Sequence, residues 1–193
     1  MTLLAASVLL SSNPKQSNAL EPIEQQIERL PNATRRLAAQ LCLPLELEAV
    51  WSVLTDYDNL TSFIPNLMSS RVVRREGLEV VLEQEGAQRF AGLRFTAKVT
   101  LELRERRPDG MLDFRMVSGD FRRFEGAWFI CPDPLGGVRL RYEVLIQACR
   151  GMPIGLIEQR LKEDLSMNLR AVAAEALKRS DAASQVQAEA TVS

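Results

Sequence analysis

Residues 67–146 contain a series of segments in which apolar and polar side chains alternate. In one of them Phe95, Ala97, Val99, Leu101 and Leu103 share one face, with polar residues between them. A period of two is typical of β-strands that bury one face. Turn signals such as Pro108-Asp109-Gly110 separate the segments. We therefore predict six successive antiparallel strands that form an amphipathic sheet.

The segment 153–178 is the longest one with helical periodicity. One apolar stripe recurs every three or four residues and consists of Ile154, Ile157, Leu161, Leu165, Leu169 and Val172. At 1.5 Å per residue this helix would be about 40 Å long, enough to cross a sheet. Because a sheet with one apolar face has to bury it, we predict that this C-terminal helix covers the sheet.

The first third of the chain predicts shorter elements. Residues 34–43 alternate and indicate one more strand. Apolar residues at helical spacing follow Pro44, and a second short helix is expected from Asp58 to near Phe63. A further short helix is expected from 21 to 30, where apolar residues again share one helical face.

The resulting fold is α+β: a strand, two short helices, six strands and a long helix. The sheet of about seven strands is expected to curve and wrap around the C-terminal helix. We assign residues 33–179 to the domain, 1–32 to an N-terminal tail that includes the short helix, and 180–193 to a disordered C-terminal tail. The apolar run within residues 1–13 lacks Lys and Arg and is too short to span a bilayer, so we interpret it as a disordered or loosely docked tail, with a secretory signal as the minor alternative. The odd number of cysteines, three, favours a reducing compartment and thus a cytoplasmic protein.

Composition excludes several kinds of chemistry. The chain has no histidine, so Ser-His-Asp and Cys-His catalysis and histidine-bound metals are ruled out. The three cysteines are far apart and lack CxxC spacing, and neither a P-loop nor a GxGxxG fingerprint occurs. We therefore predict no metal and no cofactor. The net charge of −1 argues against DNA binding.

Three segments, together with the order of elements, carry a resemblance to a known family. They are PLELEAVWSVLTDYDNLTSFIPN (44–66), GDFRRFEGAW (119–128) and MPIGLIEQRLKEDLSMNLRAVAAEAL (152–177). The chain resembles the START-like, helix-grip (SRPBCC) superfamily, in particular its polyketide cyclase/dehydrase and coenzyme Q-binding groups and their cyanobacterial and plastid branches. The resemblance covers residues 33–178. It implies a cavity between the sheet and the long helix that holds an apolar small molecule or lipid.

The residues expected to line this cavity lie on the predicted inward faces. They are Phe63, Leu82, Phe95, Phe114, Met116, Phe124, Trp128, Tyr142, Ile157 and Leu161. Such an aromatic-rich, methionine-containing lining suits a prenyl or acyl chain or a flat ring. We assign the cavity mouth to Ile64 and Pro65 and to Arg122 and Arg123. This arginine pair lies beside an expected turn, because the spacing of Phe121 and Phe124 breaks the alternation.

The favoured function is binding, transport or sequestration of a hydrophobic small molecule such as an isoprenoid quinone, a lipid or a pigment-like compound. A cofactor-independent polyketide cyclase or dehydrase is an alternative and would use Tyr142, Ser118 or Gln84 to polarise a carbonyl or move a proton. Those side chains could equally bond neighbouring backbone.

The arginine clusters at 71–75, 104–107 and 122–123 are either solvated strand ends or a surface for peripheral membrane contact. A protein- or ribosome-interaction module is the third alternative.

Overall fold

The computed structural model describes the backbone of residues 22–90, 93–149 and 154–192 and the side chains of residues 22–87, 96–149 and 158–187. The apolar N-terminal segment lies outside these residues. In chain order the elements are β1 (Glu24–Leu30), β2 (Thr34–Leu43), α1 (Leu47–Leu54), the 3-10 helix η1 (Tyr57–Ser62), β3 (Leu67–Glu76), β4 (Glu79–Phe90), β5 (Leu93–Arg106), the 3-10 turn η2 (Arg107–Asp109), β6 (Met111–Gly119), β7 (Arg123–Pro132), β8 (Val138–Gln147) and α2 (Ile154–Val192). The predicted α+β fold is confirmed, with β1 as an additional strand.

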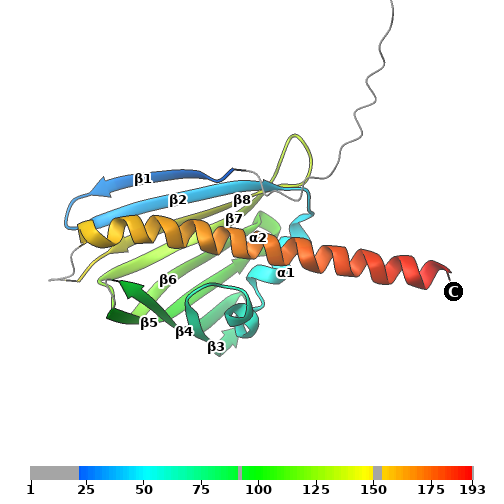
Figure 1. Ribbon diagram of the computed structural model, residues 1–193. Helices are drawn as coiled ribbons and strands as arrows, with labels where there is room; N and C mark the ends of the chain where they lie inside the picture. Colours follow the sequence, from blue (N-terminus) through cyan, green and yellow to red (C-terminus); the bar gives the residue numbers. More distant parts are fainter. Residues whose placement is uncertain (1–21, 91–92, 150–153, 193) are drawn as a thin grey trace, which may run out of the picture.

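Within the described ranges, eight strands form a single antiparallel sheet in the order β1-β2-β8-β7-β6-β5-β4-β3. The connections between β3 and β8 are hairpins, so each of these strands pairs with its neighbour in sequence. Figure 1 shows the sheet curving around α2, which lies across its concave side. The concave side is also the apolar side, because Val80, Leu82 and Leu103 on the alternate positions are buried.

The predicted apolar stripe of α2 packs against this concave face. Leu165, Leu169 and Val172 are no more than 4% exposed. Val50 and Val53 of α1 are fully buried, and α1 contacts both α2 and β7. As a result α1 fills one end of the space between the sheet and α2.

The segment that we expected to be a short helix before residue 31 is strand β1. It pairs with β2 in antiparallel register, with Ile27 opposite Leu37. The turn between the strands has Asn32 and Ala33 at positive φ, and the N–H of Thr34 bonds the carbonyl of Pro31. The helix prediction was wrong because the free edge of β2 offers backbone partners, and tertiary pairing overrides local periodicity.

The end of α2 also differs from expectation. Disorder was predicted after residue 179, but the helix continues to Val192. Residues 181–187 are all exposed, and Figure 1 shows this part of the helix extending beyond the sheet. Alanine, glutamine and glutamate favour helix, and the segment contains neither glycine nor proline, so a helix already started by packing can continue without further contacts.

An ion-pair cluster around one buried carboxylate joins α2 to the strands at one edge of the sheet. Glu158 of α2 is 6% exposed and accepts hydrogen bonds from Arg29 on β1 and Arg35 on β2 at 2.8–3.0 Å. These bonds, and the positive charges behind them, lower the pKa of Glu158 from 4.5 to about 2. Glu158 therefore stays ionised at any ordinary pH and holds the edge strands to the helix.

Strand β6 contains a bulge where it pairs with β5. Leu101 pairs with Met116, but Thr100, the residue before it, pairs with Ser118, so Val117 is an extra residue in β6. An extra residue reverses the alternation of faces beyond it. The chain then turns over residues 120–122, in agreement with the turn expected beside Arg122 and Arg123.

Candidate functional site

A cavity of about 500 Å³ lies between the concave face of the sheet and α2. Its walls come from the end of α1, from η1 and the loop after it, from strands β4 to β8 and from the first half of α2. This volume lies within the range of small-molecule binding sites. Because the alternate residues of each strand point to the same face, one face of the curved sheet supplies a nearly continuous apolar lining.

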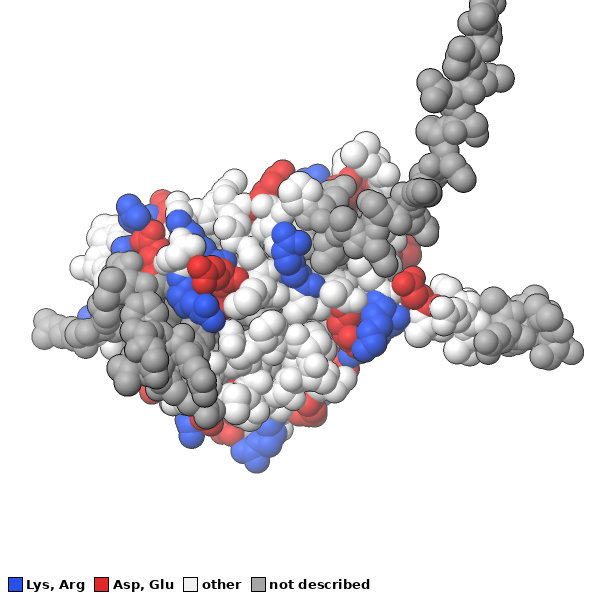
Figure 2. All heavy atoms as spheres, viewed as in Figure 1, with Lys and Arg blue, Asp and Glu red and all other residues white. Residues whose placement is uncertain are grey.

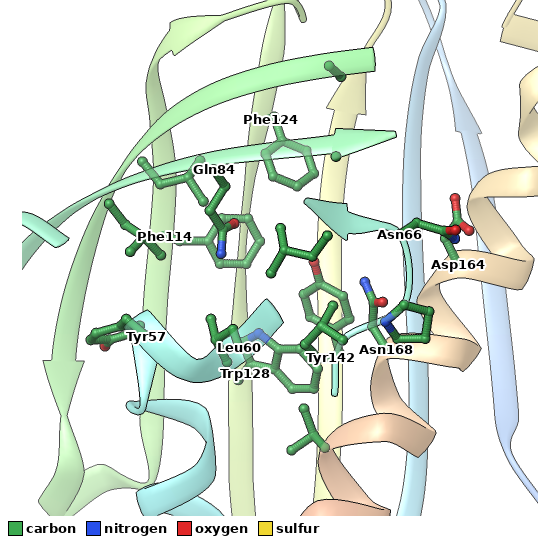
Figure 3. A pocket seen from close by; sticks show the side chains of 18 of the residues that line it. Tyr57, Leu60, Asn66, Gln84, Phe114, Phe124, Trp128, Tyr142, Asp164 and Asn168 are labelled. Atoms are coloured by element: carbon green, nitrogen blue, oxygen red, sulfur yellow. The ribbon is translucent and has the colours of Figure 1, made fainter. Parts of the chain in front are cut away.

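An aromatic wall, formed by Phe114, Phe124, Trp128 and Tyr142, covers the sheet side of the cavity (Figure 3). Trp128 and Tyr142 are opposite each other on β7 and β8 and stack with ring centroids 4.0 Å apart and planes 3° apart. The Phe114 ring lies 5.4 Å from that of Phe124 and 6.1 Å from that of Tyr142. Gly126 lies opposite Phe114 in the ladder, and its lack of a side chain leaves room for the Phe114 ring.

A polar row on α2, formed by Arg160, Asp164 and Asn168, faces the same cavity from the other side. The spacing of four residues places these side chains one above the other on the helix. Arg160 Nε lies 3.6 Å from Asp164 Oδ1, and a second nitrogen of Arg160 lies 3.2 Å from Glu163 Oε2. The guanidinium is thus already engaged by carboxylates of its own helix.

The Tyr142 hydroxyl lies in the cavity on the side of this polar row (Figure 3). Burial, and after it the negative charge of Asp164, raise the pKa of Tyr142 above its usual range. Tyr142 therefore remains a protonated hydrogen-bond donor. Tyr57, the other tyrosine of the wall, differs because its hydroxyl donates to Glu105 Oε1 at 2.9 Å.

The loop after η1 borders the cavity with Ile64, Pro65 and Asn66, and Leu67 at the start of β3 continues this border. The Asn66 carbonyl accepts a hydrogen bond from the N–H of Ala87 at 2.9 Å, which ties this loop to β4. Figure 2 shows a broad uncharged surface below α2, over the segment that carries η1, with charged side chains around its rim. The loop is therefore the apolar border between the cavity and solvent.

The cavity offers no evident metal ligands in the described side chains, since no three of their Cys, Asp or Glu residues gather closely enough to hold an ion. No helix in the described ranges is both long enough and apolar enough to cross a membrane.

With the geometry in place, the family can be assigned. The family model described as polyketide cyclase / dehydrase and lipid transport matches residues 43–173. The chain belongs to this family. The matched region runs from the end of β2 to the middle of α2, and so contains every described residue of the cavity wall. No curated protein matches the chain.

Solved structures with the family's fold include lipid-transfer proteins and cyclases. A STAR-related lipid transfer protein from Xanthomonas axonopodis has a TM-score of 0.68 and 16% identity, with 82% of this chain and 97% of that chain covered. A protein from Thermus thermophilus has a TM-score of 0.66 and 21% identity, with 75% of this chain and 99% of that chain covered. An aromatase/cyclase from a Streptomyces species has a TM-score of 0.65 and 16% identity, with 76% of this chain and 95% of that chain covered. The START-like resemblance inferred from the sequence is thus confirmed as to fold.

Most of the residues predicted for the site border the cavity of this family member. In the wall are Leu82, Gln84, Phe114, Phe124, Trp128, Tyr142, Leu161, Ile64 and Pro65. Phe63 and Met116 are half-buried and pack against the core without bordering the cavity. The side chains of Phe95 and Ile157 lie outside the described residues. The binding roles of all these residues remain predictions.

Three residues predicted for the site lie elsewhere. Ser118 is exposed, because the bulge at Val117 pairs it with Thr100 and moves it to the outer face of the sheet. Arg122 and Arg123 are also exposed and do not border the cavity, and Arg123 pairs with Glu125. The two residues before this pair, Asp120 and Phe121, occupy the expected position at the cavity instead.

Apart from Tyr142 and Gln84, sequence reasoning missed the polar residues of the site. Asn66, Asp120, Asp164 and Asn168 border the cavity, and none was a candidate. The stripe of apolar residues on α2 indicated only the part of the helix that touches the sheet. The polar row 160-164-168 lies directly beside this stripe, and its regular spacing of four residues was the available signal.

Proposed function

We propose that this protein binds a hydrophobic small molecule, such as an isoprenoid quinone, a lipid or a pigment-like compound, and carries or sequesters it between the sheet and α2. The observation that carries the proposal is the cavity of about 500 Å³ with its aromatic wall. Burial of about 300 Å² of apolar ligand surface would contribute roughly 7 kcal/mol at 25 cal/mol per Å². Association costs of several kcal/mol leave an affinity that permits exchange, as a carrier requires.

The proposal is tested by extracting the purified protein with organic solvent and identifying the compounds released by mass spectrometry. Leu161→Arg would place a long cationic side chain in the cavity wall and is expected to abolish retention. Ala174→Arg, on the exposed side of the same helix, is the matched control and is expected to retain the compound. Full retention by Leu161→Arg would contradict the proposal. A wild-type protein that never carries such a compound would favour the interaction module.

A cyclase or dehydrase is a second candidate, because the hydroxyl of Tyr142 and the amide of Gln84 border the cavity. Gln84 is tied to the sheet, since its Nε2 donates to Ser70 Oγ at 3.3 Å. The raised pKa keeps Tyr142 protonated at neutral pH, so it cannot accept a proton, although its hydroxyl can still polarise a carbonyl by hydrogen bonding. Turnover of a polyketide-like substrate that collapses in Tyr142→Phe would favour this candidate over a carrier.

The arginine clusters give little support to a membrane-binding role. Arg71 pairs with Glu83, Arg75 with Glu105 and Arg107 with Glu48. Carboxylates therefore neutralise much of the positive charge on these strand ends. Attraction to an anionic lipid surface depends on uncompensated basic charge, so the carrier proposal does not rely on these clusters.

A further inference from the structure

Two polar groups of the cavity lack a hydrogen-bond partner among the described residues. The Tyr142 hydroxyl and the Asn168 side-chain amide both border the cavity, and neither makes a hydrogen bond in the described part of the chain. Tyr142 is 9% exposed and Asn168 is half-buried. A polar group that is shielded from water and lacks a hydrogen-bond partner lowers the stability of the folded protein. A bound ligand can supply that partner.

The charged side chains of the described cavity wall do not form a binding site for an anion. They are Arg160, Asp164 and Asp120, so carboxylates outnumber guanidinium groups. Arg160 already pairs with Glu163 and Asp164. An ionised carboxylate or phosphate in this space would lose its hydration and lie near the like charge of Asp164, which is costly. Asp120 is exposed and accepts a hydrogen bond from the N–H of Lys98, so its charge adds less.

From these two observations we infer that the ligand is a neutral amphiphile, with a hydroxyl or carbonyl head bonded to Tyr142 and Asn168 and an apolar body against Phe114 and Phe124. The inference rests on the proposed function and narrows it. Fatty acids and phospholipids fall outside the class, whereas alcohols, ketones and quinones fall within it. Tyr142 supplies the donor, and the Asn168 amide can donate or accept, so either oxygen type can be bonded. The head is positioned by these two residues, while Asp164 discriminates against an anion.

The test compares 1-decanol with decanoate at pH 8, where the acid is ionised, by displacement of a neutral fluorescent dye from the cavity. Wild-type protein is expected to bind decanol at least roughly tenfold more tightly than decanoate. Tyr142→Phe and Asn168→Leu each remove one neutral hydrogen bond and are expected to weaken decanol binding by about 3–10-fold. Ala174→Arg, on the exposed side of α2 and outside the cavity wall, is the control and is expected to leave decanol binding unchanged.

Charge discrimination is tested separately with Asp164→Asn, which removes one carboxylate and releases Arg160 from this pair. This variant is expected to improve decanoate binding several-fold relative to decanol, which a merely structural role of Asp164 would not do.

Equal or tighter binding of decanoate by the wild-type protein would overturn the inference and leave the carrier proposal standing. Unchanged decanol affinity in both Tyr142→Phe and Asn168→Leu would also overturn it. If the dye and both probes fail to bind, the carrier proposal itself fails.

Discussion

At the scale of single residues, the shape of the cavity depends on a glycine as much as on the aromatic side chains. A Cβ atom on Gly126 would lie 2.0 Å from the carbonyl oxygen of Glu143 and 2.8 Å from a ring carbon of Phe114. Both distances are far below van der Waals contact. Any larger residue here would displace strand β8 or the Phe114 ring, and with it the aromatic wall.

We therefore expect Gly126→Ala to destabilise the fold by about 1–3 kcal/mol, the usual cost of overpacking a core. Urea denaturation would measure the change. Gly86→Ala is a matched control in the same sheet, because its Cβ would meet only the Asn66 carbonyl oxygen at an ordinary 3.5 Å. Equal stability of the two variants would show that β8 adjusts without cost.

At the scale of elements, the far part of α2 fastens the segment that borders the cavity. Arg179 of α2 pairs with Asp56 at 2.8 Å, just before η1, and its guanidinium lies 5.8 Å from the ring centroid of Phe63, just after η1. One side chain thus holds both ends of this short 3-10 helix. The contact is independent of the cavity wall, so it can be removed without altering the lining.

If the loop after η1 is the gate, Arg179→Ala should raise the rate of ligand exchange several-fold while changing equilibrium affinity little. The ion pair and the cation–π contact are each worth about 0.5–1 kcal/mol at partly exposed sites. Stopped-flow displacement of a bound fluorescent ligand would measure the rate. Lys178→Ala is the control, because among the described side chains Lys178 forms an ion pair only with Glu175 of its own helix. An unchanged exchange rate would place the exit route elsewhere.

At the scale of the whole molecule, the Glu158 cluster makes global stability depend on pH. The pKa of Glu158 falls from 4.5 to about 2 on folding, because hydrogen bonds from Arg29 and Arg35 favour the ionised form. The folded protein therefore binds this proton more weakly than the unfolded chain does. The stabilisation is complete above about pH 4.5 and is lost as the pH falls towards 2.

The expected consequence is a Tm difference between wild type and Glu158→Gln that is largest at pH 7 and shrinks between pH 4.5 and 2. Thermal unfolding followed by circular dichroism at several pH values would measure it. Glu28→Gln is the control at the same edge of the sheet, since Glu28 pairs with Arg36 while both side chains are 54% exposed. A Tm difference that is as large at pH 2 as at pH 7 would contradict the conclusion that the ionised carboxylate of Glu158 stabilises the fold.

How far the sequence predicted this molecule depended on whether a feature was local. Alternation placed Leu82, Phe114 and Trp128 on the correct face, because the period of a strand is a property of its own residues. The same reasoning failed for β1, whose identity depends on the free edge of β2. Asn168 was missed for a related reason: a polar residue beside an apolar helical stripe acquires its place in a cavity only when the opposite wall is known.

The bulge at Val117 also bears on how such a site can change over time. Because this one extra residue decides which face Ser118 occupies, a deletion in β6 would bring the hydroxyl to the inner face without altering any other residue. Substitution at 118 cannot achieve this, since the side chain there points to solvent whatever its identity. The chemistry available in the cavity thus depends on the length of one strand, a variable on which insertions and deletions act and point mutations do not.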